Sequence, residues 1–170
     1  RRTRRAPSRA RCPRSVRVKR RSPTREKADR PYPPIESYAF IGDCHSGALV
    51  SRTGSIDWCC LPRFDSASVF GRLLDWSRGG YCAVTPQAEY EMSRDYIDGT
   101  LVLSTVFRTA TGEAELIDCV TMREGGAREP HRQLVRVIDG RRGSVELAID
   151  VVPRFDYGDV APWLRHHHNG

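Results

Sequence analysis

The sequence predicts an all-β protein, an antiparallel β-sandwich with one short helix. From residue 31 onward, short apolar stretches rich in β-branched and aromatic residues recur between turn-forming Gly, Pro and Asp residues. Residues 145–151 and 135–137 alternate between apolar and polar side chains, which is typical of strands with one solvated face. A parallel α/β sheet would need helices of about 10–15 residues between its strands, and the pattern offers none.

The first predicted strand covers residues 38–41 and ends at Gly42-Asp43. Residues 48–50 and 55–58 then flank Arg52-Thr53-Gly54, a short glycine-containing segment that indicates a β-hairpin. Two strands are therefore expected to pair early in the chain.

Residues 67–76 predict the helix, because apolar side chains at 69, 70, 73, 74 and 76 share one helical face. Asp65 or Ser66 provides an N-cap, and Gly79-Gly80 provides a stop signal.

Six further strands are predicted in the remainder of the chain. They cover residues 81–84, 88–92, 101–107, 114–120, 133–138 and 145–152, and Asp139-Gly140 separates the last two. The sequence Pro62-Arg63-Phe64-Asp65 recurs as Pro153-Arg154-Phe155-Asp156, which suggests a shared local turn but no repeat architecture.

The net charge of +7 is unevenly distributed along the 170 residues. Residues 1–30 hold 14 basic and 2 acidic side chains, whereas residues 31–170 hold 14 basic and 19 acidic ones. Residues 1–30 are predicted to be a disordered Arg-rich extension, because they contain too few large apolar side chains to offset their ordering entropy. Translated upstream sequence, a nucleic-acid or membrane-surface arm and a targeting peptide all remain open for this extension. Residues 31–170 are expected to form the folded domain.

The cellular setting is expected to be the cytoplasm. No stretch approaches the roughly 18 apolar residues of a membrane span, and the first thirty residues lack the apolar core of a secretory signal. The six cysteines are too sparse and irregular for a disulfide scaffold, and they are expected to be buried thiols. A zinc site at Cys44-His45 with Cys59-Cys60 is the weaker alternative, and no cofactor is expected.

The sequence shows no self-contained catalytic motif of the P-loop, dinucleotide, metalloprotease or serine-hydrolase type. The run His166-His167-His168 is interpreted as flexible chain more readily than as a metal ligand. Two suitably spaced carboxylates would suffice for glycoside hydrolysis, but linear sequence does not show which of Asp43, Asp57, Asp65 and Asp156 converge.

An ordered series of motifs resembles the opening of the bacterial family-15 glycoside hydrolases, the trehalase-like and glucoamylase-like group. The series covers residues 33–165. Its motifs are Pro33-Pro34-Ile35-Glu36-Ser37-Tyr38-Ala39-Phe40-Ile41-Gly42-Asp43-Cys44, Gly47-Ala48-Leu49-Val50, Gly54-Ser55-Ile56-Asp57-Trp58-Cys59-Cys60-Leu61-Pro62-Arg63-Phe64-Asp65-Ser66, Ser68-Val69-Phe70, Pro153-Arg154-Phe155-Asp156-Tyr157-Gly158 and Pro162-Trp163.

The resemblance implies a trehalase-like N-terminal β-sandwich that precedes an (α/α)6 barrel. In that family the two catalytic glutamates belong to the barrel, which lies beyond this chain, and the sandwich itself is expected to be truncated here. None of the four aspartates named above therefore inherits a catalytic role.

The leading hypothesis is a non-catalytic domain that packs against the barrel of an α-glucosidic hydrolase acting on trehalose or a related α-glucoside. Candidate substrate-edge or barrel-facing residues are Asp57, Trp58, Arg63, Phe64 and Asp65, which combine aromatic faces with bidentate polar groups in one Pro-bounded loop. Their alternative role is structural, with Trp58 as a core anchor and Arg63 and Asp65 as a clamp. A stand-alone carbohydrate-binding or protein-interaction module is the second hypothesis. Nucleic-acid binding would depend on the basic extension alone.

Overall fold

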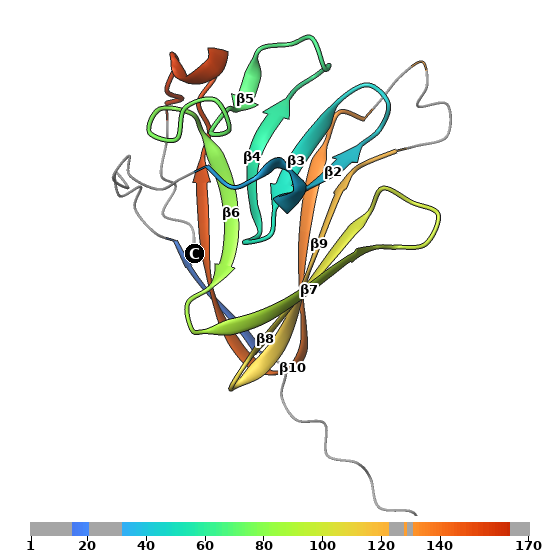
Figure 1. Cartoon of the computed structure of the whole chain (residues 1–170), viewed down its shortest axis with the longest axis vertical. Coiled ribbons are helices and arrows are strands. Elements are labelled where there is room, and N and C mark those ends of the chain that lie inside the picture. The colour runs from blue at the N-terminus through green and yellow to red at the C-terminus, as the bar shows by residue number, and fades with distance from the viewer. Residues whose placement is uncertain (1–14, 21–31, 123–127, 129–130, 164–170) are drawn as a thin grey trace, which may run out of the picture.

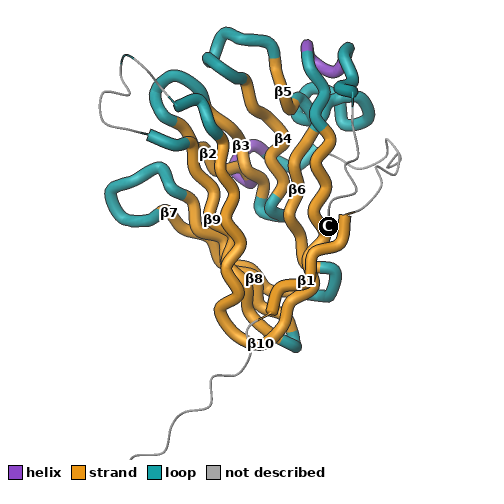
Figure 2. Tube along the Cα trace, turned by 180° about the vertical axis from the view of Figure 1, so that it is seen from behind, coloured by secondary structure: helices purple, strands orange, loops and turns teal. Residues whose placement is uncertain are grey.

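The computed structural model describes residues 15–20, 32–122, 128 and 131–163, and it shows a curled β-sandwich (Figures 1 and 2). The strands are β1 Ser15–Arg20, β2 Tyr38–Gly42, β3 Gly47–Ser51, β4 Ser55–Cys60, β5 Ser68–Phe70, β6 Tyr81–Pro86, β7 Tyr90–Tyr96, β8 Leu103–Thr109, β9 Gly112–Val120 and β10 Leu134–Val152. Two single-turn 3-10 helices, η1 Ile35–Ser37 and η2 Asp156–Gly158, accompany them. The predicted all-β fold is confirmed.

The strands form a continuous path in the order β2-β3-β4-β6-β10-β9-β8-β7, with β5 beside β4 and β1 beside β10. Sheet A comprises β1 to β6 with the C-terminal half of β10, and sheet B comprises β7, β8, β9 and the N-terminal half of β10. Every strand pair is antiparallel except β1 with β10. The predicted hairpin is confirmed as β3 and β4, with Ala48 opposite Cys59.

The predicted break at Asp139-Gly140 is wrong, because the two expected strands are one 19-residue strand, β10. Asp139 and Gly140 continue to pair with Glu115 and Ala114 of β9, and the register shifts only between Gly140 and Arg142. A bulge of this kind bends a strand and increases its twist without ending it. The strand therefore descends in sheet B and returns in sheet A, joining the two layers (Figure 1).

The predicted helix over residues 67–76 is also wrong. Ser68 and Phe70 pair with β4, and residues 71–79 form successive turns. The backbone N–H groups of Gly71 and Arg72 both donate to the carbonyl of Gly80 at 3.1 Å, so the segment doubles back on itself. The spacing of apolar side chains fitted a helix, but pairing with β4 satisfies the backbone of β5 instead.

Side chains connect the two ends of the strand path where no backbone ladder forms. The Tyr96 hydroxyl of β7 accepts from the Phe40 N–H of β2 at 3.0 Å and donates to the Phe40 carbonyl at 2.7 Å. Arg94 donates to the carbonyls of Val50 and Ser37. These bonds occupy polar groups at the edge of β2, which would otherwise be open to another strand.

The core consists of two clusters of buried apolar side chains. The first joins side chains of sheet A with Leu103 of β8 and Val120 of β9, and the second lies around the bend of β10. The first includes Ala39, Ile41, Ala48, Val50, Ile56, Cys59, Phe70, Cys82, Leu103 and Val120, and the second includes Val84, Phe107, Ala114, Leu116, Val145 and Leu147. Burial of these side chains is the main favourable term of folding.

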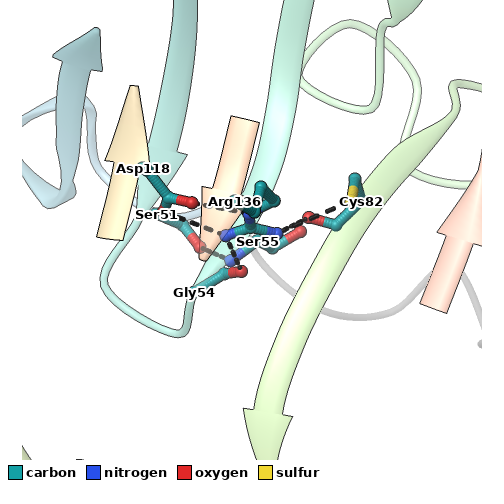
Figure 3. A network of polar contacts seen from close by, with 6 residues as sticks. All are labelled: Ser51, Gly54, Ser55, Cys82, Asp118 and Arg136. Atoms are coloured by element: carbon teal, nitrogen blue, oxygen red, sulfur yellow. Dashed lines mark hydrogen bonds and ion pairs between the residues drawn. The ribbon is translucent and has the colours of Figure 1, made fainter. Parts of the chain in front are cut away.

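A buried ion pair links the sheets across this core (Figure 3). The guanidinium of Arg136 on β10 binds both carboxylate oxygens of Asp118 on β9, at 2.7 and 3.1 Å. It also donates to the carbonyls of Cys82 at 2.6 Å and Gly54 at 2.8 Å, which belong to sheet A and its β3–β4 turn. The turn can approach because Gly54 has φ +79° and no Cβ, and a Cβ would lie 2.3 Å from the Val84 carbonyl.

The prediction that residues 1–30 are disordered is wrong for Ser15–Arg20, which form β1 and pair in parallel with Ser144 to Ile149 of β10. Val16 packs against the second core cluster, and this contact provides the apolar burial that composition alone did not reveal. Residues 1–14 and 21–31 lie outside the described residues.

Candidate functional site

The loop between β4 and β5 holds three of the five candidate residues, Arg63, Phe64 and Asp65, at one end of the sandwich (Figure 1). The Arg63 guanidinium binds the Asp65 carboxylate through two hydrogen bonds, at 2.9 and 3.0 Å, and both side chains are about two-thirds exposed. The Phe64 N–H donates to the His45 carbonyl at 2.9 Å, which ties the loop to the β2–β3 turn. The pair holds the two side chains of the loop together. Because both are exposed to solvent, this ion pair adds little to the stability of the fold.

Phe64 is the exposed aromatic group of this loop. Its side chain is 54% exposed and stacks on Phe40 of β2, with ring centroids 6.3 Å apart and planes 16° from parallel. Cys44, His45, Arg63, Asp65, Arg128 and Arg132 surround it along a cavity of about 610 Å³. The loop thus presents an aromatic face among several cations.

The segment that follows β10 brings more exposed apolar side chains to the same end. Phe155, Tyr157 and Val160 are each between 41% and 50% exposed, and the Arg154 N–H donates to the Val69 carbonyl of β5 at 3.0 Å. Figure 1 shows η2 and the β4–β5 loop at one end of the molecule. We call Phe64, Phe155, Tyr157 and Val160 the aromatic end.

The two Pro-Arg-Phe-Asp copies do not share a turn. In the second copy Asp156 and Tyr157 adopt φ +52° and +57°, a left-handed conformation that the first copy lacks. Arg154 donates to the Pro153 carbonyl, whereas Arg63 binds Asp65.

Asp57 lies apart from the loop, on the outer face of sheet A, where it is 1% exposed. Its carboxylate accepts hydrogen bonds from the Tyr38 hydroxyl at 2.9 Å and the Ser55 hydroxyl at 2.5 Å. Burial raises the pKa of Asp57, although these two hydrogen bonds and the charge of Arg72 oppose the rise. Asp57 therefore organises the sheet locally and does not face the β4–β5 loop.

Trp58 is half-buried and packs against Tyr157, with ring centroids 6.3 Å apart. The register of β3 with β4 shifts here, since Leu49 lies opposite Trp58 and Val50 lies opposite Ile56, so Asp57 is the extra residue of a β-bulge. The structure brings Arg63, Phe64 and Asp65 together, connects Trp58 to the aromatic end through Tyr157, and separates Asp57 from them.

Sequence reasoning missed a second group, which surrounds a cavity of about 550 Å³ on the outer face of sheet A. We call it the outer hollow and define it by Asp57, Arg72, Trp76, Tyr81, Thr85 and Asp150. The Arg72 guanidinium lies between the rings of Trp76 and Tyr81, 3.9 and 4.0 Å from their centroids. The available signal was an arginine, Arg72, inside the apolar stretch 69–76.

The four aspartates considered for hydrolysis occupy different places. Asp57 lines the outer hollow and Asp65 lines the cavity beside Phe64, whereas Asp43 and Asp156 line neither. Asp43 Oδ1 instead accepts from the N–H groups of His45 and Ser46 at 3.0 and 2.8 Å, which shapes the β2–β3 turn.

The weak zinc hypothesis receives no support from the part of the chain that the structure describes. There, no three His, Cys, Asp or Glu side chains gather closely enough to hold a metal ion. Cys59 and Cys60 are buried and Cys44 is exposed. The run His166-His167-His168 lies outside the described residues.

Comparison with known sequences decides the family. The sequence profile of the family described as "Trehalase-like, N-terminal" matches residues 26–170. The chain belongs to this trehalase-like N-terminal family. The profile extends the motif-based resemblance at both ends.

Curated relatives of this trehalase-like domain are named trehalases. The chain is 34% identical to the trehalase of Mycolicibacterium smegmatis over 148 residues, which cover 78% of this chain and 22% of the relative. It is 35% identical to the trehalase of Mycobacterium tuberculosis over 141 residues, covering 75% and 21% respectively. Trehalase 1 of Sulfolobus acidocaldarius is 34% identical over 136 residues, covering 80% and 22%.

The chain thus spans about a fifth of the length of these relatives. No solved structure matches it. Among the described residues, no helix has the length and apolar character needed to cross a membrane.

Proposed function

We propose that this chain is the non-catalytic N-terminal β-sandwich of a family-15-like glycoside hydrolase that acts on trehalose or related α-glucosides. It would pack on and support an (α/α)6 catalytic barrel, and the chain alone would not hydrolyse sugar. The observation that carries the proposal is the family match together with relatives named trehalases, of which the chain covers about a fifth. Free cysteines among the described residues favour a reducing, cytoplasmic setting.

The aromatic end is the surface we propose for docking the catalytic part. Phe64, Phe155, Tyr157 and Val160 leave apolar area in water, and aromatic anchors of this kind dominate protein interfaces. Arg63 and Asp65 beside them are exposed and already paired, which suits the polar rim of an interface. Asp57 is proposed as a structural residue, and Trp58 as the support of Tyr157.

The test is a binding measurement between this chain and a truncated M. smegmatis trehalase that lacks the matched segment. We expect a 1:1 complex, and we expect Phe64→Ser to weaken it at least about tenfold, since interface aromatic anchors contribute about 2 kcal/mol or more. Ile35→Ser is the matched control, because Ile35 is also exposed but lies in η1. No complex, or equal weakening by both substitutions, would contradict the proposed docking surface.

A stand-alone carbohydrate-binding or protein-interaction module is the alternative. The outer hollow, a cavity of about 550 Å³ lined by aromatic and polar side chains, is the observation that favours a sugar-binding role.

A further inference from the structure

The cavity between the β4–β5 loop and the segment before β10 gathers positive charge on a domain whose body is acidic. Its volume is about 610 Å³, and three guanidinium groups line it together with one carboxylate. We call it the arginine cavity and define it by Arg63, Asp65, Arg128 and Arg132. Residues 31–170 as a whole carry 14 basic and 19 acidic side chains, so the excess of cations is local.

The cations of the arginine cavity are accessible to an incoming group. Arg128 and Arg132 are exposed, and their guanidinium groups form no hydrogen bond or ion pair with another described residue. Asp65 occupies one edge of the Arg63 guanidinium, through Nε and one terminal nitrogen, and the Arg63 side chain is 67% exposed. A guanidinium carries more N–H donors than these contacts use, so all three arginines can still bind an anion.

Unusual backbone conformations concentrate at the same end of the sandwich. Cys44 and Arg132, which line the cavity, adopt φ +68° and +56°. The other two left-handed non-glycine residues of the described chain, Asp156 and Tyr157, belong to η2 beside the aromatic end. Side chains rarely adopt this conformation, and residues held in it cluster where a protein binds other molecules. Their placement favours a binding role for this end.

The surroundings of the arginine cavity favour a protein over a small free anion. Exposed guanidinium groups gain little from an ion pair in water. Phe64, however, lines the cavity and also belongs to the aromatic end, so one occupant can cover both. Apolar contact there would exclude water, and the lower local dielectric would strengthen each ion pair. The net negative charge of residues 31–170 disfavours nucleic acid.

We infer that the arginine cavity receives carboxylates of the catalytic part, whose apolar surface covers the aromatic end at the same time. The planar guanidinium group matches a carboxylate through two parallel hydrogen bonds, and complementary charges beside an apolar contact fix the orientation of a complex. The inference rests on the proposed function, because it names the chemistry of the docking partner. That partner carries an apolar patch bordered by acidic side chains.

The test is the rate of association between the full 170-residue chain and the truncated M. smegmatis trehalase. Changing Arg128→Glu and Arg132→Glu together should slow association at least about tenfold at about 0.1 M salt, because interface charges act chiefly on the association rate. The difference should largely vanish at about 1 M salt, where the Debye length falls from about 10 Å to about 3 Å. The basic residues 1–30 are the same in all variants, so they do not affect the comparison.

The matched control is the double variant Arg52→Glu with Arg142→Glu, which changes the net charge equally at two exposed side chains. Arg52 lies in the β3–β4 turn and Arg142 lies at the bulge of β10, both away from the cavity. We expect this control to associate at nearly the wild-type rate. Equal slowing in the two double variants would show a general effect of charge and would overturn the inference.

Lysine variants separate charge from structural damage. Arg128→Lys with Arg132→Lys keeps both charges and should retain the association rate of the wild type. Association as slow as in the glutamate variant would overturn the inference. If Phe64→Ser weakens the complex but the glutamate variant associates normally, the inference fails and the proposed function stands. Absence of any complex would overturn both.

Discussion

Arg136 is the side chain that connects the most separate parts of the sandwich. It binds Asp118 of sheet B and two carbonyls of sheet A, and the side chains of Arg136 and Asp118 are only 10% and 0% exposed. Pairing and hydrogen bonds are what make such burial of charge tolerable. The network thus fixes how the two layers meet at the β3–β4 turn.

We expect Arg136→Met to lower the free energy of unfolding by about 3–5 kcal/mol, because Asp118 would remain buried without a cation. Urea unfolding measures this loss. Arg78→Met is the control, since the pair of Arg78 and Asp159 is about two-thirds exposed and its loss should cost less than about 1 kcal/mol. Similar losses in both variants would contradict a stabilising role of the buried Arg136–Asp118 network.

The pH dependence of stability should report the burial of Asp57. Because burial raises the pKa of this carboxyl, the folded protein binds the proton more tightly than the unfolded chain does. Stability is therefore lost as pH rises from the unfolded pKa, about 3.9, through the folded pKa. The Asp57→Asn variant has no carboxyl to titrate, so its free energy of unfolding should rise relative to that of the wild type between the unfolded and the folded pKa of Asp57. Urea unfolding at several pH values measures this difference.

Asp75 gives the opposite sign and serves as the control. Hydrogen bonds from Ser77 and from the N–H of Arg78 lower the pKa of Asp75. Its contribution to stability is present above the unfolded pKa and is lost as pH falls through the folded pKa. Asp75→Asn should therefore become less stable relative to the wild type as pH rises, and parallel trends for the two variants would contradict these assignments.

The candidate residues show what linear sequence can and cannot predict about the site. The structure places Arg63, Phe64 and Asp65 together on the exposed β4–β5 loop. Asp57 and Trp58 were grouped with them because they are close in sequence, but both belong to β4, where Asp57 is the extra residue of a β-bulge and Trp58 packs against Tyr157. The contacts of Arg72 with Trp76 and Tyr81 depend on how the β5–β6 connection folds, and no local pattern encodes that.

Among the elements, those set by local signals were predictable and those set by tertiary pairing were not. The β3–β4 hairpin follows from a glycine turn between two apolar stretches. Residues 67–76 have helical spacing, yet pairing of Ser68 and Phe70 with β4 decides their conformation. Gly140 suggested a strand end, whereas hydrogen bonds to β9 carry β10 through a bulge.

The strand β1 pairs with an edge of β10. The trehalase-like family match begins at residue 26, so it includes β10 but not β1. Deleting residues 1–20 should uncover this edge, and exposed strand edges promote pairing between chains. We expect concentration-dependent association by light scattering for that deletion. Deleting residues 1–14 retains Ser15–Arg20 and should not increase association. Identical behaviour of the two deletions would contradict the role given to β1.

At the scale of the whole molecule, we propose that scaffold and docking belong to different parts of the domain. The curled sheet and the Arg136 network form the scaffold, and the aromatic end is the surface proposed to dock a catalytic part. Residues 31–170 carry more acidic than basic side chains, so the body of the domain offers no general attraction for nucleic acid.

Trehalose hydrolysis by a chimera tests the central claim most directly. Residues 26–170 would replace the matched segment of the M. smegmatis trehalase, and glucose release from trehalose would be compared with that of this chain alone and of the relative without the segment. We predict activity in the chimera, none in this chain alone, and a large loss when the segment is deleted. Hydrolysis by the 170-residue chain alone, or full activity of the relative without the segment, would contradict the claim that this domain supports a catalytic part located elsewhere.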